Sequence, residues 1–152
     1  MRTDEVIVGG EESGGLSIWG HIPEKDGIIA NLSILEAMAY ENKSLYKMIE
    51  ELKQEIGIEY INHRIDLRLS EDTKEKAVDL FRNNPPKQLA EMNVIEVSRK
   101  DGVKLYFDDT NSWMLIRPSG TEPLLRIYFE TDSQQKLDKL VEDTRNLVDN
   151  IK

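Results

Sequence analysis

The sequence WMLIRPSGTEPLLRIYFE, residues 113–130, decides how the second half of the chain folds. Two apolar segments, 113–116 and 124–130, flank a loop at 117–123. In the second segment apolar residues alternate with polar ones such as Arg126, and this period of two is typical of a strand with one buried face. The pattern predicts two paired strands that present the loop at their ends, with Arg126 on the face away from the core.

The 117–123 loop carries groups that suit an anion. Arg117 offers a planar fork of donors, and Ser119 and Thr121 offer hydroxyls. Gly120 lets backbone N–H groups approach a ligand closely. A proline at each end fixes φ, so little of the loop must be ordered when a ligand binds. With Arg126 as a second positive charge these residues predict an anion-binding site, although an ordinary surface turn uses the same residue types.

Residues 58–152 have the pattern of a two-layer α+β domain. From residue 60 onward the order is strand, helix, four strands and a final helix that begins at Ser133. Asp101 and Gly102, between two of the strands, are a hairpin-turn signal. Because sequential strands with short connections pair antiparallel, we predict an antiparallel sheet of about four to five strands covered by two helices on one face.

Residues 1–57 predict only part of an α/β domain. The apolar run at 6–8 predicts a buried strand. Two amphipathic helices follow, capped by Asp26 and Ser44, and Gly57 suits the end of the second. The strands that would complete such a domain are missing from this part. We therefore expect it to expose apolar surface, which favours self-association.

A second loop, GGEESGG at residues 9–15, follows the first strand. Glu11 and Ser13 are separated by one residue, so in an extended loop both side chains face the same side. A carboxylate and a hydroxyl that project together suit the hydroxyls of a sugar. The same residues also suit a flexible, solvated loop. Lys25, in HIPEKDG at 21–27, equally suits a solvated surface cation.

Together these stretches resemble the α-D-phosphohexomutase family, which includes phosphoglucomutase, phosphomannomutase and phosphoglucosamine mutase. E-x-S-G at 11–14 is similar to the sugar-selecting loop of that family's third domain, and R-P-S-G-T-E-P at 117–123 is similar to the phosphate-binding loop of its fourth domain. The resemblance covers essentially the whole chain, but only the C-terminal part of the family's four-domain enzyme. It implies that residues 1–57 end the third domain and that residues 58–152 form the phosphate-binding C-terminal domain.

The resemblance also implies a reaction, the interconversion of hexose 1-phosphate and hexose 6-phosphate. In the family a phosphoserine of the first domain transfers its phosphoryl group, the second domain holds magnesium, and a hexose bisphosphate is the intermediate and activator. Three residues are assigned to the sugar: Glu11, Ser13 and Lys25. Five are assigned to the phosphate that is not transferred: Arg117, Ser119, Gly120, Thr121 and Arg126. The kind of hexose stays open, with a lean towards glucose.

Neither catalytic loop of that family is present in the sequence, which has no matching serine loop and no D-x-D-x-D loop for a metal. We therefore expect no catalytic residue, no metal ligand and no mutase activity in this chain alone. The parent enzyme would be an intramolecular phosphotransferase whose N-terminal domains are this chain's partners. A stand-alone, non-catalytic sugar-phosphate-binding module fits the same residues. A structural or interaction domain is a third possibility, and the two polar loops weigh against it.

Composition and charge exclude several other classes of function. The 152 residues carry a formal net charge of −9, whereas a protein that binds the phosphate backbone of nucleic acid normally has a basic face. There is no cysteine, which excludes disulfides and thiolate metal sites. No apolar run is long enough to span a bilayer. We expect a cytoplasmic protein with a hexose phosphate as its ligand and with neither nucleic acid nor membrane as its partner.

Overall fold

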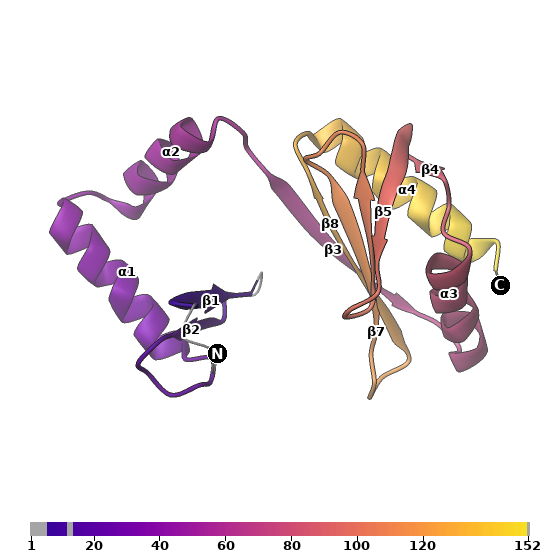
Figure 1. Ribbon diagram of the computed structural model, residues 1–152, viewed down its shortest axis with the longest axis horizontal. Helices are drawn as coiled ribbons and strands as arrows, with labels where there is room; N and C mark the ends of the chain where they lie inside the picture. Colours follow the sequence, from indigo (N-terminus) through magenta and orange to yellow (C-terminus); the bar gives the residue numbers. More distant parts are fainter. Residues whose placement is uncertain (1–5, 12–13, 152) are drawn as a thin grey trace. The chain divides into compact units, whose positions relative to one another are not determined.

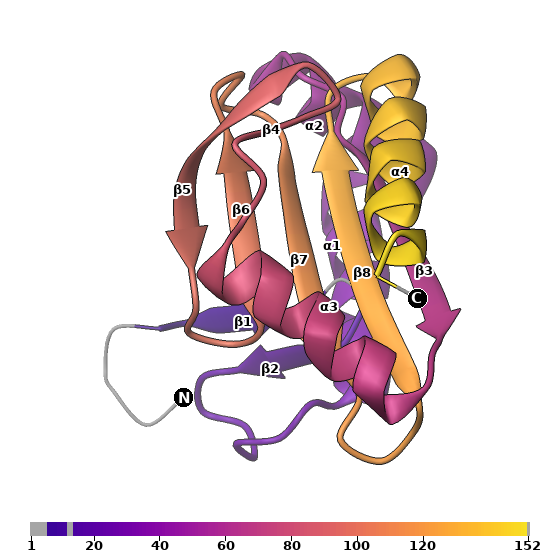
Figure 2. The same ribbon diagram turned by 90° about the vertical axis from the view of Figure 1, so that its right-hand side faces the viewer.

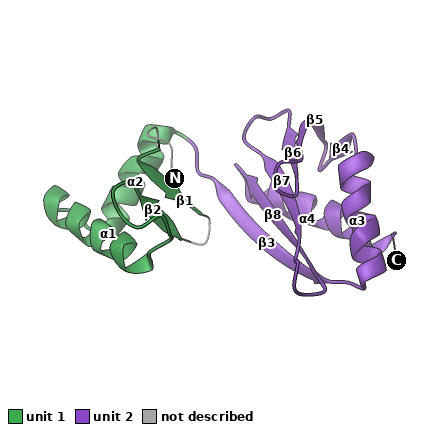
Figure 3. Cartoon of the chain, turned by 60° about the horizontal axis from the view of Figure 1, so that its bottom comes forward, with its two compact units in different colours: residues 1–57 green, residues 58–152 purple. Residues whose placement is uncertain are grey.

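The computed structural model describes residues 6–11 and 14–151. The chain forms two compact units, residues 1–57 and 58–152 (Figure 3). Each unit has its own helices and strands. None of the helices within the described residues is long and apolar enough to cross a membrane.

The first unit combines a β-hairpin with two helices (Figure 1). Strands β1 (Val8–Gly10) and β2 (Leu16–Ile18) pair antiparallel. Helix α1 (Gly27–Glu41) begins at the predicted cap, where the Asp26 carboxylate accepts hydrogen bonds from the backbone N–H groups of the next turn. Helix α2 (Leu45–Ile56) is capped in the same way by Ser44. Both predicted helix starts are confirmed.

Apolar side chains of the first unit are largely exposed. Neither α1 nor α2 has a buried residue. The prediction of a buried strand at 6–8 is wrong, since Val6, Ile7 and Val8 are 41%, 74% and 54% exposed. The physical reason is that a hairpin of two three-residue strands covers little area, and an isolated two-stranded hairpin cannot bury its own faces. The expected exposed apolar surface is present.

The second unit is a two-layer α+β structure, as predicted. All strands of its sheet pair antiparallel, in the order β3-β8-β7-β6-β5-β4. Helices α3 (Glu71–Asn83) and α4 (Gln134–Asp149) cover the same face of this sheet (Figure 2). The strand bounds are Ile61–Arg68 for β3, Gln88–Leu89 for β4, Met92–Ser98 for β5, Val103–Phe107 for β6, Trp113–Pro118 for β7 and Leu124–Thr131 for β8. The sequence pattern missed β4, because two residues are too few to show alternation.

The core lies between the sheet and its two helices. Phe81 of α3, Phe107 of β6 and Phe129 of β8 are at most 1% exposed, and Leu140 and Val148 of α4 pack in the same cluster. Each such side chain stabilises the fold by about 1.5–3 kcal/mol when it leaves water. Alternate residues of β6, β7 and β8 are buried in this way, so the residues between them lie on the opposite, open face of the sheet.

A charged network ties α4 to the turn before β7. Lys136 of α4 donates to Asp109 at 2.9 Å and to Asp132 at 2.8 Å. The hydrogen bond from Lys136 holds the pKa of Asp132 below its ordinary value of 3.8. Burial raises the pKa of Asp109, but hydrogen bonds from Ser112 and Lys136 outweigh it and lower that pKa. A lowered carboxyl pKa contributes stability that is lost as the pH falls through it, so the network is intact above about pH 4.

The hairpin turn between β5 and β6 packs against β7. Gly102 has φ +77°, a left-handed conformation that favours glycine. A Cβ atom at Gly102 would lie 2.3 Å from the carbonyl oxygen of Ile116 and 2.8 Å from Cγ of Arg117. The absence of a side chain at Gly102 therefore lets the turn lie directly against the residues that lead into the 117–123 loop.

We predict that Gly102→Ala destabilises the second unit by about 2 kcal/mol or more, because it combines a strained φ with a clash against main-chain atoms. Thermal unfolding measures this as a lower Tm. The control is Gly120→Ala, since a Cβ at Gly120 meets nothing within 4 Å and its φ is not left-handed. Equal stability of the two variants would contradict the close packing of the turn on β7.

Candidate functional site

The 117–123 loop closes the β7–β8 hairpin with bonds of its own. The backbone N–H of Ser119 donates to the carbonyl oxygen of Leu124 at 2.9 Å. The backbone N–H of Glu122 donates to Oγ of Ser119 at 3.2 Å, and Ser119 is buried. Gly120 and Thr121, at the tip, are exposed. The Ser119 hydroxyl thus holds the loop together, while the tip faces solvent.

A lysine of α3 supports the loop from its buried side. Lys74 is only 8% exposed. Its Nζ donates to the carbonyl oxygens of Ser119 and Glu122, at 3.3 and 3.4 Å, and to the carboxylate of Glu71 at 2.9 Å. The sequence analysis missed this residue. A signal was available, because Lys74, Ala77 and Phe81 follow the helical spacing of one face, and all three are buried.

The two predicted arginines lie directly opposite each other on neighbouring strands. Arg117 of β7 pairs in register with Arg126 of β8, and both are on the open face of the sheet. Nη2 of Arg117 is 3.3 Å from a carboxylate oxygen of Asp101, and Nη2 of Arg126 is 3.1 Å from one of Glu122. Arg126 therefore points away from the core, as predicted.

This arrangement concentrates positive charge beside the exposed tip of the loop. Like charges directly opposite each other destabilise a strand pair, so the pairing of Arg117 with Arg126 is not explained by sheet stability. Each guanidinium instead has a carboxylate at its side, and exposed ion pairs of this kind are weak. An anion with several oxygens can replace these carboxylates and bind both arginines at once.

The predicted sugar residues lie in the first unit, where the structure brings two of the three together. Nζ of Lys25 is 2.9 Å from Oε2 of Glu11. Gly15 permits this contact, because a Cβ there would be 2.9 Å from Cδ of Lys25 and 3.4 Å from Oε2 of Glu11. The Glu11 N–H also donates to the Gly15 carbonyl oxygen at 2.9 Å. Ser13 lies outside the described residues, so its role as a sugar contact stays a prediction.

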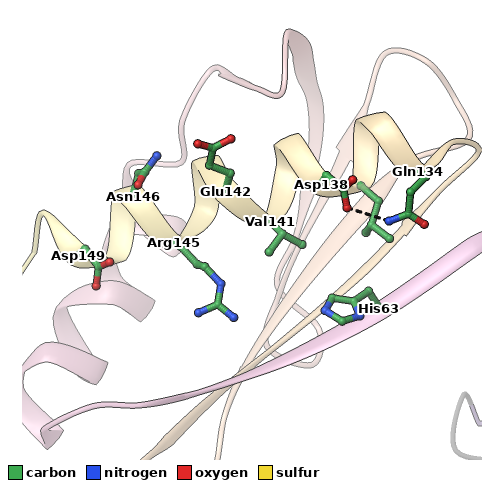
Figure 4. Close-up of a pocket in the computed structure, with 9 residues that line it drawn as sticks. His63, Gln134, Asp138, Val141, Glu142, Arg145, Asn146 and Asp149 are labelled. Carbon is green, nitrogen blue, oxygen red and sulfur yellow. Dashed lines mark hydrogen bonds between the residues drawn. The ribbon is translucent and has the colours of Figure 1, made fainter.

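A separate groove of about 440 Å³ runs between α4 and the edge strand β3 (Figure 4). His63 faces it from β3, and α4 contributes mainly charged and amide side chains, among them Glu142 and Arg145. Arg117, Ser119, Gly120, Thr121 and Arg126, all described in the structure, do not line this groove. Among the described residues there is also no group of three or more His, Cys, Asp or Glu side chains that could hold a metal ion.

Two family models match the chain. Residues 68–147 match the C-terminal domain of phosphoglucomutase/phosphomannomutase, and residues 1–56 match its alpha/beta/alpha domain III. The first match covers the sheet from the end of β3, α3, the 117–123 loop and all but the last two residues of α4. The second covers the first unit almost completely.

Curated relatives carry the names of mutases of this family. A phosphoglucosamine mutase of Methanocaldococcus jannaschii is 31% identical over 151 residues, which are 97% of this chain and 31% of the relative. A phosphoglucomutase/phosphomannomutase of Thermococcus kodakarensis is 30% identical over 135 residues, which are 89% of this chain and 27% of the relative. The chain thus spans less than a third of the length of these relatives.

Solved structures agree in fold. A phosphoglucomutase/phosphomannomutase family protein of Burkholderia thailandensis superposes with a TM-score of 0.70 at 20% identity, over 96% of this chain and 28% of that one. A candidate phosphomannomutase of Thermus thermophilus has a TM-score of 0.69 at 30% identity, over 94% of this chain and 26% of that one. With the family models across both units, the chain belongs to the phosphoglucomutase/phosphomannomutase family.

Proposed function

We propose that this chain is the sugar- and phosphate-binding C-terminal part of a phosphohexomutase that interconverts hexose 1-phosphate and hexose 6-phosphate. One observation carries the proposal: Arg117 and Arg126 are paired across β7 and β8, beside the exposed tip of the 117–123 loop. The family membership and the mutase names of the relatives support it.

In this proposal the loop binds the phosphate that is not transferred. Arg117 and Arg126 supply charge-assisted hydrogen bonds, each contributing about 1.5–3 kcal/mol. Thr121 and the backbone at Gly120 supply further donors at the exposed tip. Ser119 is buried and holds Glu122, so its contribution is to the shape of the loop. Glu11, Lys25 and Ser13 contact the sugar.

The remaining chemistry is assigned to other parts of the enzyme. A phosphoserine gives its phosphoryl group to the hexose phosphate, which forms a hexose bisphosphate as the intermediate. The intact enzyme is proposed to be cytoplasmic. Magnesium bound by another domain of the enzyme would supply charge stabilisation during that transfer. The proposal assigns no magnesium ligand to this chain, whose sequence has no D-x-D-x-D loop. Glucose, mannose and glucosamine phosphates are all candidate ligands, and the names of the relatives include the glucosamine type.

We predict saturable amide shifts centred on Ser119 and Thr121 when the chain is titrated with glucose 1-phosphate in an NMR experiment. Inorganic phosphate should give the same shifts at the loop, and only the sugar phosphate should add shifts around Glu11. Light scattering before the titration should establish the oligomeric state of the chain, because the exposed apolar residues of α1 and α2 favour self-association.

Arg117→Ala should weaken binding of either ligand about tenfold or more, since it removes charge-assisted hydrogen bonds. Arg145→Ala, which removes an arginine of α4 in the separate groove, is the matched control and should bind normally. If phosphate binds equally well to the Arg117→Ala protein, or produces no loop shifts in the wild-type protein at millimolar concentration, the proposed phosphate site is wrong.

Removal of the carboxylate beside Arg117 should strengthen phosphate binding. In Asp101→Asn we expect the affinity for phosphate to rise by about two- to fivefold, because phosphate no longer competes with the Asp101 carboxylate for Arg117. The gain is small because exposed ion pairs are weak. Asparagine also keeps the turn, since Asn-Gly suits such a hairpin as well as Asp-Gly. Asp138→Asn on α4 changes the net charge equally and should leave the affinity unchanged. Equal gains in both variants would indicate a general charge effect.

The chain by itself should not turn over substrate. In a coupled assay with glucose 1-phosphate and magnesium, we expect no glucose 6-phosphate above background, because positioning one phosphate supplies neither the nucleophile nor the metal. A full-length mutase of the family is the positive control. Turnover by this chain would show that it carries catalytic groups of its own.

A further inference from the structure

We propose that Lys74 is a positioning residue, which turns the backbone N–H of Gly120 towards the bound phosphate. The inference deepens the proposed function and rests on it, because the 117–123 loop must bind phosphate for this orientation to matter. Lys74 itself does not touch the ligand in this account. It lies on the buried side of the loop, whereas Gly120 is exposed at the tip.

One peptide group connects Lys74 with the tip of the loop. The carbonyl oxygen of Ser119 and the N–H of Gly120 belong to the same planar peptide unit, and the chain has no cis peptide bond. In a trans peptide the C=O and the N–H point in opposite directions. Nζ of Lys74 holds the Ser119 oxygen at 3.3 Å on the buried side. The Gly120 N–H must therefore point away from Lys74, towards the exposed side.

Two backbone N–H groups at the tip of the loop are available to a ligand. Within the part of the chain that the structure describes, neither the Gly120 nor the Thr121 N–H donates a hydrogen bond to another group. The Ser119 N–H is already used in the hairpin, and the Glu122 N–H is held by Oγ of Ser119. The tip thus offers two backbone N–H donors. The carbonyl oxygens of Ser119 and Glu122, on either side of the tip, are turned inward and accept hydrogen bonds from Lys74.

The hydrogen bond from Lys74 to the second carbonyl group orients no N–H donor. Lys74 also holds the carbonyl oxygen of Glu122, at 3.4 Å. The next residue is Pro123, so that peptide group has no N–H to orient. This bond fixes the far end of the loop instead. The ammonium group has three donors, and the loop and Glu71 together provide an acceptor for each.

Burial of the ammonium group argues against a purely structural role. Taking a charged lysine out of water is costly unless it is paired and hydrogen-bonded. An apolar side chain of similar length on this buried face of α3 would avoid that cost. What an apolar side chain could not provide at this place is a cation that binds two loop carbonyls at once. Preorganised donors cost no ordering when the anion arrives.

The test is a set of substitutions at Lys74, each examined with and without inorganic phosphate. Lys74→Met keeps the length and removes the donors, and Lys74→Arg keeps charge and donors. The matched control is Lys76→Met, which removes an exposed lysine of the same helix, paired with Asp72. Two quantities are measured: the orientation of the Gly120 N–H from residual dipolar couplings in the free protein, and the Kd for phosphate from amide shifts.

We expect Lys74→Met to reorient the Gly120 N–H and to raise the Kd for phosphate about tenfold, the effect of losing one hydrogen bond to a charged group. Lys74→Arg should recover most of the affinity, and Lys76→Met should match the wild-type protein in both quantities. An unchanged Gly120 orientation, or a changed orientation with an unchanged Kd, overturns the proposal for Lys74.

Two further outcomes are distinguishable. If the wild-type protein binds no phosphate, the proposed function fails, and the orientation of Gly120 in Lys74→Met still decides whether Lys74 positions the peptide. If Lys74→Met does not fold, the rate of proton exchange at the Lys74 ammonium group is measured by NMR in the wild-type protein instead. Slow proton exchange at that ammonium, with a larger shift on phosphate addition than Lys76 shows, supports the proposal, and exchange as fast as at Lys76 overturns it.

Discussion

The pairing of β7 with β8 is the constraint on which the second unit depends. Alternate residues of both strands are buried under α3 and α4, so the intervening residues must lie on the open face. The register then sets Arg117 opposite Arg126. A shift of either strand by one residue would turn its guanidinium group towards the core and expose its core residues. Burial of the apolar face thereby fixes the position of the charged groups.

Much of this was predictable, because the decisive signals are local in sequence. The alternation in β8, the helix start at Ser133 and the Asp101-Gly102 turn each act within a few residues, and the structure has all of them. The loop motif was recognisable for the same reason, since its chemistry lies in one continuous stretch. The roles of its individual residues remain predictions.

The features that sequence analysis missed depend on contacts between distant residues. Lys74 and Ser119 are 45 positions apart, and nothing local to α3 indicates that a loop carbonyl lies above its buried face. The ion pair of Asp101 with Arg117 likewise arises only when the β5–β6 turn packs on β7. The exposure of residues 6–8 was mispredicted because an apolar run indicates a strand without indicating what covers it.

The absence of buried residues from α1 and α2 has a consequence for how the chain unfolds. Cooperative unfolding requires side chains that lose their packing together, and within residues 6–11 and 14–151 the buried core lies in the second unit. A denaturant or calorimetric transition of this chain is therefore a property of residues 58–152 alone. The helices of the first unit contribute a gradual loss of helicity, as short helices do when little tertiary packing holds them.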